Sequence, residues 1–114
     1  MKVAEAAKEL EGTLMTGAAD NEILGAYTSD LLSDVMANSR EGDLWITLQK
    51  HVNIVAVAQL NGISAIALVN NRKPEPDTLA RAKEMGVAII STPLQAFDAA
   101  GVLYARGIRG RRQI

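Results

Sequence analysis

The clearest pattern in the chain is a series of short, continuous apolar runs separated by segments of helical periodicity. The runs cover residues 44–48, 65–69 and 87–90, and each has the length of a β-strand. Continuous apolar runs, in contrast to alternating ones, are typical of strands that are covered on both faces. The pattern therefore predicts buried strands in a mostly parallel sheet with helices packed against it.

Helical segments are expected between and after these strands. Residues 49–64 have the length that a crossover between parallel strands needs, so the apolar run within them is interpreted as a helix and not as a strand. Pro76 near the start and Gly86 just past the end bound a second helix over residues 76–85. Residues 92–95, Thr-Pro-Leu-Gln, fit a capping box with proline at the first position of a third helix. The predicted order is β-α-β-α-β-α in the C-terminal two-thirds, which gives an α/β fold.

The N-terminal third has a less regular pattern. A helix is expected in the first ten residues, and strand candidates follow at residues 13–15 and 23–27. Ser29 is placed to cap a helix that runs to about Asn38, with Asp30 placed well for the helix dipole. Both strand candidates are assigned to positions beside the three strands, which makes a central sheet of about four to six strands.

Composition restricts the classes of protein that this fold can serve. The length of 114 residues fits one domain, and the absence of cysteine together with a single histidine excludes disulfides, thiolate metal sites and multi-histidine zinc sites. The chain contains no apolar run long enough for a membrane span and no signal-peptide pattern, so a cytoplasmic protein without a membrane partner is expected.

Charge divides the chain into two parts. Residues 1–105 hold eight basic and thirteen acidic residues, whereas residues 106–114 hold four arginines and no acid. We therefore expect one acidic domain over residues 1–105 and a basic, flexible tail over residues 106–114. The acidic domain argues against a nucleic-acid-binding face.

Polar residues follow the carboxyl ends of the three predicted strands. Parallel strands end at the same edge of a sheet, which is where ligands bind in open α/β folds. The basic residues there, together with the free N–H groups of helix N-termini, suit a phosphate or a carboxylate. The candidate ligand-binding residues are Thr47, Gln49, Lys50, His51, Asn53, Asn70, Asn71, Arg72, Ser91 and Thr92. A structural role remains open for each of them, since Asn70-Asn71 suits a turn with positive φ and Thr92 suits a helix cap.

No catalytic residues, metal ligands or cofactor are predicted. His51 is the one candidate general base, but no nucleophile motif accompanies it, and a polar residue at a helix start is the alternative interpretation. The chain contains neither a Walker-type phosphate loop nor a dinucleotide-binding G-x-G-x-x-G motif.

Three segments carry a resemblance to a known family. Residues 41–47, 66–74 and 87–92 follow the family's succession of strand, polar loop and helix, and from about Gly25 to Tyr104 the chain resembles the DRTGG domain. That domain occurs in phosphotransacetylases and beside CBS domains, and it is related to the N-terminal domain of HPr kinase/phosphorylase. Residues 50–51 and 69–71 replace the Asp-Arg pair and the Thr-Gly-Gly triplet that name the family, so no role of those residues is transferred.

The resemblance implies a regulatory or accessory module and not an enzyme. We expect a non-catalytic domain that senses a small anionic metabolite or nucleotide at the strand ends. The alternative is an interaction module without a ligand, a homodimer that docks on a metabolic or redox enzyme. The helix around residues 54–60 is one candidate surface for the homodimer, unless that helix packs on the sheet.

Overall fold

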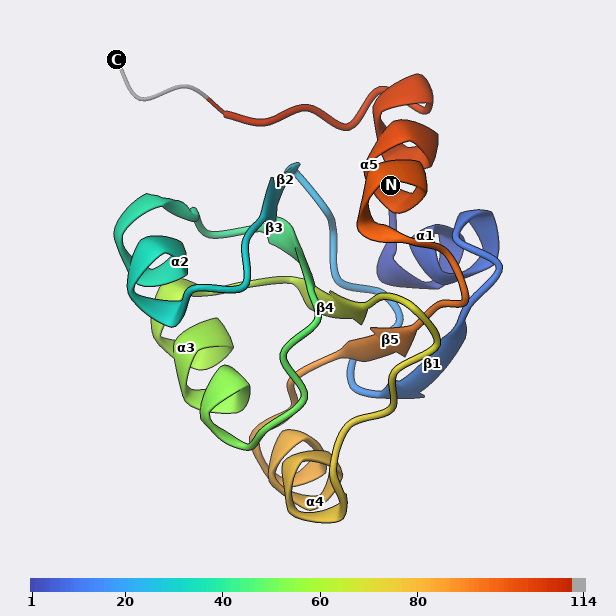
Figure 1. Ribbon diagram of the computed structural model, residues 1–114. Coiled ribbons are helices and arrows are strands. Elements are labelled where there is room, and N and C mark those ends of the chain that lie inside the picture. The colour runs from blue at the N-terminus through green and yellow to red at the C-terminus, as the bar shows by residue number, and fades with distance from the viewer. Residues whose placement is uncertain (112–114) are drawn as a thin grey trace.

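The computed structural model describes residues 1–111 and consists of a central sheet with helices on both faces (Figure 1). Within residues 1–111, no helix is long and apolar enough to cross a membrane. The elements in chain order are α1 (Val3–Glu9), β1 (Thr13–Thr16), β2 (Gly25–Thr28), α2 (Leu32–Asn38), β3 (Asp43–Thr47), α3 (Asn53–Asn61), β4 (Ala65–Leu68), α4 (Pro76–Met85), β5 (Ile89–Ser91) and α5 (Ala96–Ala105).

The sheet has five strands in the order β1-β5-β4-β3-β2. The strands β2, β3, β4 and β5 are parallel, and β1 pairs antiparallel with β5. The predicted mostly parallel α/β sheet is therefore confirmed. The two N-terminal strand candidates lie at opposite edges of the sheet, with β1 beside β5 and β2 beside β3.

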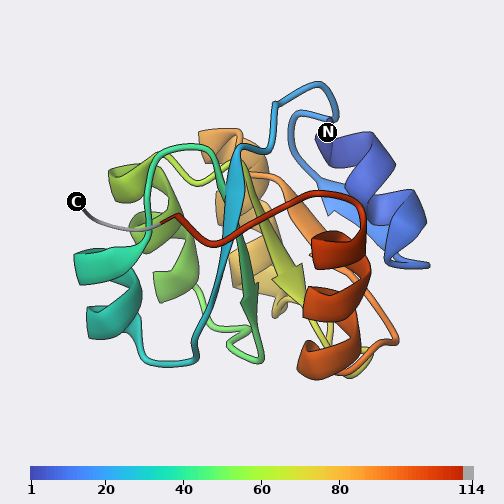
Figure 2. The same ribbon diagram turned by 90° about the horizontal axis from the view of Figure 1, so that it is seen from above.

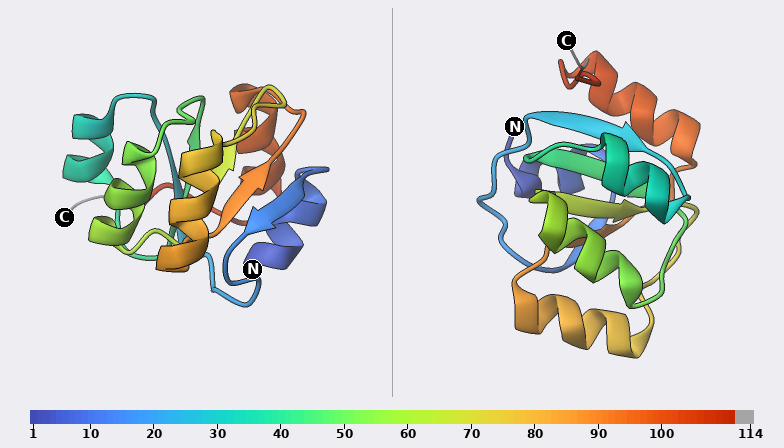
Figure 3. Two further views of the ribbon diagram at one scale, coloured as in Figure 1. Left: turned by 90° about the horizontal axis from the view of Figure 1, so that it is seen from below. Right: turned by 90° about the vertical axis from the view of Figure 1, so that its left-hand side faces the viewer.

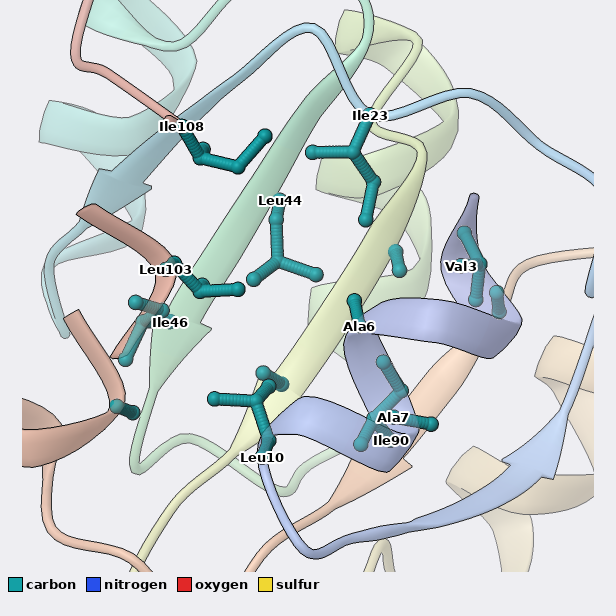
Figure 4. Close-up of a cluster of buried hydrophobic side chains, with 14 of the residues drawn as sticks. Val3, Ala6, Ala7, Leu10, Ile23, Leu44, Ile46, Ile90, Leu103 and Ile108 are labelled. Carbon is teal, nitrogen blue, oxygen red and sulfur yellow. The ribbon is translucent and has the colours of Figure 1, made fainter. Parts of the chain in front are cut away.

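Two apolar cores lie on the two faces of the sheet. Helices α1 and α5 cover one face and helices α2, α3 and α4 cover the other (Figures 2 and 3). The side chains of β3 alternate between these cores, since Leu44 and Ile46 belong to the first and Trp45 to the second. Figure 4 shows Leu44 and Ile46 with side chains of α1 and α5 in the first core. Both faces of these strands are buried, which explains why the apolar runs are continuous.

Helix boundaries follow local chemistry at α3 and α4. Gly62 and Gly86 end these helices in the left-handed conformation, with φ of 66° and 71°. Pro76 is the first residue of α4, as predicted. The buried face of α3 includes Ile54, Val55, Val57 and Ala58, so the candidate surface around residues 54–60 packs on the sheet.

The expected starts of two helices are wrong. Helix α5 begins at Ala96 and not at Pro93, because the Thr92 hydroxyl donates to the Leu10 carbonyl oxygen (2.6 Å) and accepts from the Leu94 N–H. Helix α2 begins at Leu32, since the Ser29 hydroxyl accepts from the Leu31 N–H before the helix starts.

The segment 106–111 lies against the sheet edge at β2 (Figure 2). The Ala26 N–H donates to the Arg109 carbonyl oxygen (3.2 Å), and Ile108 is buried in the first core. The Arg111 guanidinium pairs with the buried carboxylate of Asp43, with Nε 3.1 Å from Oδ1. This packing differs from the flexible tail expected over residues 106–114, because Ile108 supplies apolar contact and Asp43 supplies a counter-charge. Residues 112–114 of the expected tail lie outside the described residues.

Candidate functional site

A hollow of about 250 Å³ lies where β2, β3 and β4 end and α5 begins. Four segments from separate parts of the chain meet there, because the carboxyl ends of parallel strands lie at the same edge of the sheet. The lining residues are Thr28, Asp30, Ile46, Thr47, Leu48, Val69, Asn70, Gln95, Ala96 and Phe97.

Asp30 joins the ends of β2 and β3 at this hollow. Its Oδ1 accepts hydrogen bonds from the Thr47 hydroxyl (2.9 Å) and from the Leu48 N–H (2.7 Å). The Gln49 side chain donates to the Asp30 backbone carbonyl (2.9 Å). Sequence reasoning assigned Asp30 to a helix dipole and missed it here. The available signal was its position three residues after the end of the strand candidate at residues 23–27.

Asn70 and Asn71 form the turn after β4 in a left-handed conformation, with φ of 57° and 60°. Their N–H groups donate to the carbonyl oxygens of Leu94 and Thr92, both at 2.8 Å. This turn confirms the structural interpretation of the pair, since asparagine tolerates positive φ better than most residues. Asn70 also lines the hollow, whereas Asn71 lies outside its lining.

Ser91 and Thr92 are buried, and their hydroxyl groups bind backbone carbonyls. Ser91 donates to the Arg72 carbonyl (2.6 Å) and accepts from the Lys73 ammonium (3.1 Å). Thr92 donates to the Leu10 carbonyl. These two hydroxyls hold neighbouring loops in place, and neither residue lines the hollow.

Contacts of Lys50 and His51 connect the loop after β3 to the start of α4. The His51 Nδ1 lies 2.9 Å from the Glu75 carboxylate, and the Lys50 carbonyl accepts from the Thr78 hydroxyl (2.8 Å). Lys50, His51 and the exposed Arg72 lie outside the lining of the hollow.

A second hollow, of about 550 Å³, lies along α3 and α4. Asn53 lines it together with Asp77, Arg81 and other residues of these two helices. It is the larger of the two, but it lies away from the strand ends. Since loops of several strands build the first hollow, we take that one as the candidate site.

The charge in the candidate site is negative. Asp30 is the only charged side chain among its lining residues. Ala96 and Phe97 are the first residues of α5, where N–H groups lack partners within the helix. Gln95 precedes them and makes no side-chain cap, so its carboxamide remains available to a ligand.

A hydrogen bond beside the site fixes the start of α2. The Tyr27 hydroxyl donates to Asp34 Oδ2 at 2.8 Å, and this bond raises the pKa of Tyr27. Hydrogen bonds from the Ser29 side chain, and next from Tyr27, lower the pKa of Asp34. The contact links β2 to α2 on either side of the loop that carries Asp30.

Comparison with solved structures identifies a similar fold. One match is the crystal structure of the CBS and DRTGG domains of the regulatory region of Clostridium perfringens pyrophosphatase, complexed with the activator diadenosine tetraphosphate. The two chains share 15% identity with a TM-score of 0.66, and the match covers 89% of this chain and 48% of that one. The present chain thus spans about half the length of that protein chain, and the likeness concerns the fold.

Comparison at the level of sequence identifies the family. No curated protein matches the chain significantly. The family model for the DRTGG domain matches residues 5–105, which extends the resemblance of residues 25–104 to include α1 and β1. The chain therefore belongs to the DRTGG domain family.

Proposed function

We propose that this domain is a non-catalytic regulatory or accessory module that binds a nucleotide or another small anionic metabolite in the hollow at the strand ends. The observation that carries the proposal is the convergence of Thr47, Asn70 and Gln95, from three separate segments of the chain, on one hollow. Such a crevice at the carboxyl ends of parallel strands is where α/β folds bind ligands.

The comparison supports the regulatory role and the class of ligand. The pyrophosphatase region with the similar fold is regulatory, and its crystal structure contains a nucleotide activator. By analogy, we expect the present domain to respond to a metabolite and to pass that response to a partner enzyme.

A binding role also fits the placement of the single histidine. His51 faces Glu75 on the α4 side of the sheet edge, outside the lining of the hollow. A general base must lie within hydrogen-bonding reach of the proton that it removes. We therefore expect His51→Ala to leave the ligand response unchanged.

A thermal-shift screen tests the proposal. The panel contains adenine and guanine nucleotides, nicotinamide cofactors, and small phosphorylated or carboxylate metabolites. A ligand at 100 times its dissociation constant stabilises the folded state by about 2.7 kcal/mol, which raises the melting temperature of a domain of this size by roughly 10 °C.

Two matched variants locate the response. Asn70→Gly and Asn71→Gly both keep a residue that adopts positive φ, but only Asn70 lines the hollow. We expect Asn70→Gly to reduce the shift and Asn71→Gly to preserve it. A flat screen with well-folded protein, or equal effects of both variants, would count against a ligand at this site.

The outer face of α5 supports a second candidate function, which is self-association. Phe97 and Tyr104 on this face are 85% and 59% exposed, and they flank Gly101. An antiparallel pair of α5 helices centred on Gly101 would place the exposed Asp98 of one copy near Arg109 of the other, which stacks on Tyr104. We propose a homodimer through this face as the alternative to a ligand at Phe97, because the partner helix would cover the Phe97 side chain. Light scattering should then show a dimer for the native chain and a monomer for Tyr104→Asp.

A further inference from the structure

The charge of the hollow is the wrong sign for a phosphate group. Asp30 is the only charged residue in the lining, while Lys50, Arg72 and Lys73 lie outside it. A phosphate at the start of α5 would share this small space with the Asp30 carboxylate. Repulsion between two anions opposes the attraction that the helix N-terminus offers. An uncharged part of the ligand therefore suits this space better than its anionic part.

The hydrogen bonds of Asp30 specify what that part must offer. Oδ1 already accepts from Thr47 and Leu48, whereas Oδ2 has no hydrogen-bond partner among residues 1–111. An ionised carboxylate can only accept, so a group that binds Oδ2 must be a donor such as a hydroxyl. The Thr47 proton is committed to Asp30, so Thr47 does not compete for that role.

An exposed aromatic ring stands at the same hollow. Phe97 is 85% exposed although it is fully apolar, and the walls near it include Ile46, Leu48 and Val69. A flat ring of a ligand would cover the Phe97 side chain by stacking, as nucleobases do on aromatic side chains. The lining thus combines an acceptor for a hydroxyl with an apolar surface for a ring.

Resting on the proposed function, we infer that the hollow holds the nucleoside part of the ligand. A ribose hydroxyl donates to Asp30 Oδ2, the base stacks on Phe97, and any phosphate extends outward into solvent. The affinity of the site then resides in the nucleoside and not in its charge.

Calorimetric titration of the whole chain with common ribonucleosides, their monophosphates and inorganic phosphate tests this inference. We expect a nucleoside to bind within about threefold of its monophosphate, because the phosphate adds little, and we expect inorganic phosphate not to bind. Asp30→Asn should weaken nucleoside binding about tenfold, since an amide nitrogen replaces or competes with the charged acceptor. Phe97→Ala should also weaken it about tenfold through loss of stacking.

Two controls separate binding from folding. Asp30→Asn keeps an oxygen that can accept from Thr47 and Leu48, and its melting temperature reports whether the loop is intact. Asp98→Asn removes an exposed carboxylate next to Phe97 but outside the lining, and it should leave binding unchanged.

The other outcomes distinguish this inference from the proposed function. Binding that requires the phosphate and is strengthened by Asp30→Asn would overturn the inference while the proposed function stands. If both Asp30→Asn and Phe97→Ala left nucleoside binding unchanged, the inference would also be overturned, because the site would lie elsewhere. Failure of every nucleoside, nucleotide and metabolite to bind would overturn the proposed function as well.

Discussion

Asp30 holds two strand ends together and also faces the hollow. Its Oδ1 accepts from the Thr47 hydroxyl, which is buried, and from the Leu48 N–H. Removal of the carboxylate leaves both donors without this acceptor at the sheet edge. The stability of the strand ends and the chemistry of the site therefore depend on one side chain.

We expect Asp30→Ala to lower the free energy of unfolding by about 1–2 kcal/mol, because it removes both hydrogen bonds. Asp30→Asn should cost less, since its amide oxygen can replace Oδ1. Urea unfolding monitored by circular dichroism measures both values. Equal losses for the two variants would show that these hydrogen bonds do not set the stability of the loop.

The pair of Tyr27 and Asp34 predicts a dependence of stability on pH. The pKa of Asp34 is lowered in the folded state by hydrogen bonds from Ser29 and Tyr27, so its stabilising contribution is present above its ordinary pKa. That contribution is lost as the pH falls through the lowered pKa. We expect Tyr27→Phe to raise the pKa of Asp34 toward its ordinary value and to weaken this acid sensitivity. A carboxyl-carbon NMR titration measures the pKa directly, and an unchanged Asp34 titration would contradict the assignment.

At the scale of elements, apolar runs were sufficient to predict the parallel strands. Residues 44–47, 65–69 and 87–90 are buried, so burial leaves a strong local signal. The starts of α2 and α5 carried no such signal. The Thr92 hydroxyl donates to Leu10, which is distant in the sequence. The local sequence around Thr92 is the same whether its hydroxyl caps α5 or makes this long-range contact. The position of β2 also depends on long-range pairing with β3.

Segment 106–111 packs closely against strand β2 at Gly25. A methyl group on this residue would lie 2.7 Å from Arg111 Nε and 2.9 Å from the Arg109 carbonyl oxygen. We expect Gly25→Ala to displace the segment and to lower the free energy of unfolding by about 1–3 kcal/mol. Hydrogen exchange at the Ala26 N–H, which donates to Arg109, should become faster.

Gly101 provides the matched control for this substitution. It lies within α5, and within a single copy of the chain a methyl group there would meet open space. Gly101→Ala should therefore stabilise the chain by roughly 0.5–1 kcal/mol through helix propensity. If Gly25→Ala were as well tolerated as Gly101→Ala, the docking of segment 106–111 would not contribute to stability.

At the scale of the whole molecule, the two cores share one sheet. Trp45 is fully buried in the core beneath α2, α3 and α4, and its indole N–H donates to the Ser29 carbonyl at 2.8 Å. Leu44 and Ile46 on the same strand belong to the other core. We expect one cooperative transition, with Trp45 fluorescence and far-ultraviolet circular dichroism giving the same urea midpoint. Separate midpoints would show that the two faces unfold independently.

The candidate site could be predicted only in part at this scale. The rule that ligands bind at strand carboxyl ends placed Thr47 and Asn70 at the carboxyl edge of the sheet, and both line the hollow. The same rule could not separate the two sides of that edge. Helix α5 brings Gln95 and Phe97 to one side, whereas Lys50 and His51 turn toward α4 on the other. Which loop residues share a hollow depends on helix packing and not on sequence proximity.

The most direct test of ligand binding at the strand ends is an amide NMR titration of the whole chain with the nucleosides and nucleotides described above. If the hollow is the site, the largest shifts will occur at Leu48, Asn70, Ala96 and Phe97, which line it. Shifts confined to Asn53, Ala56 and Arg81 would place the ligand in the hollow between α3 and α4 and contradict this assignment. The absence of shifts with every compound would contradict the proposed ligand class itself.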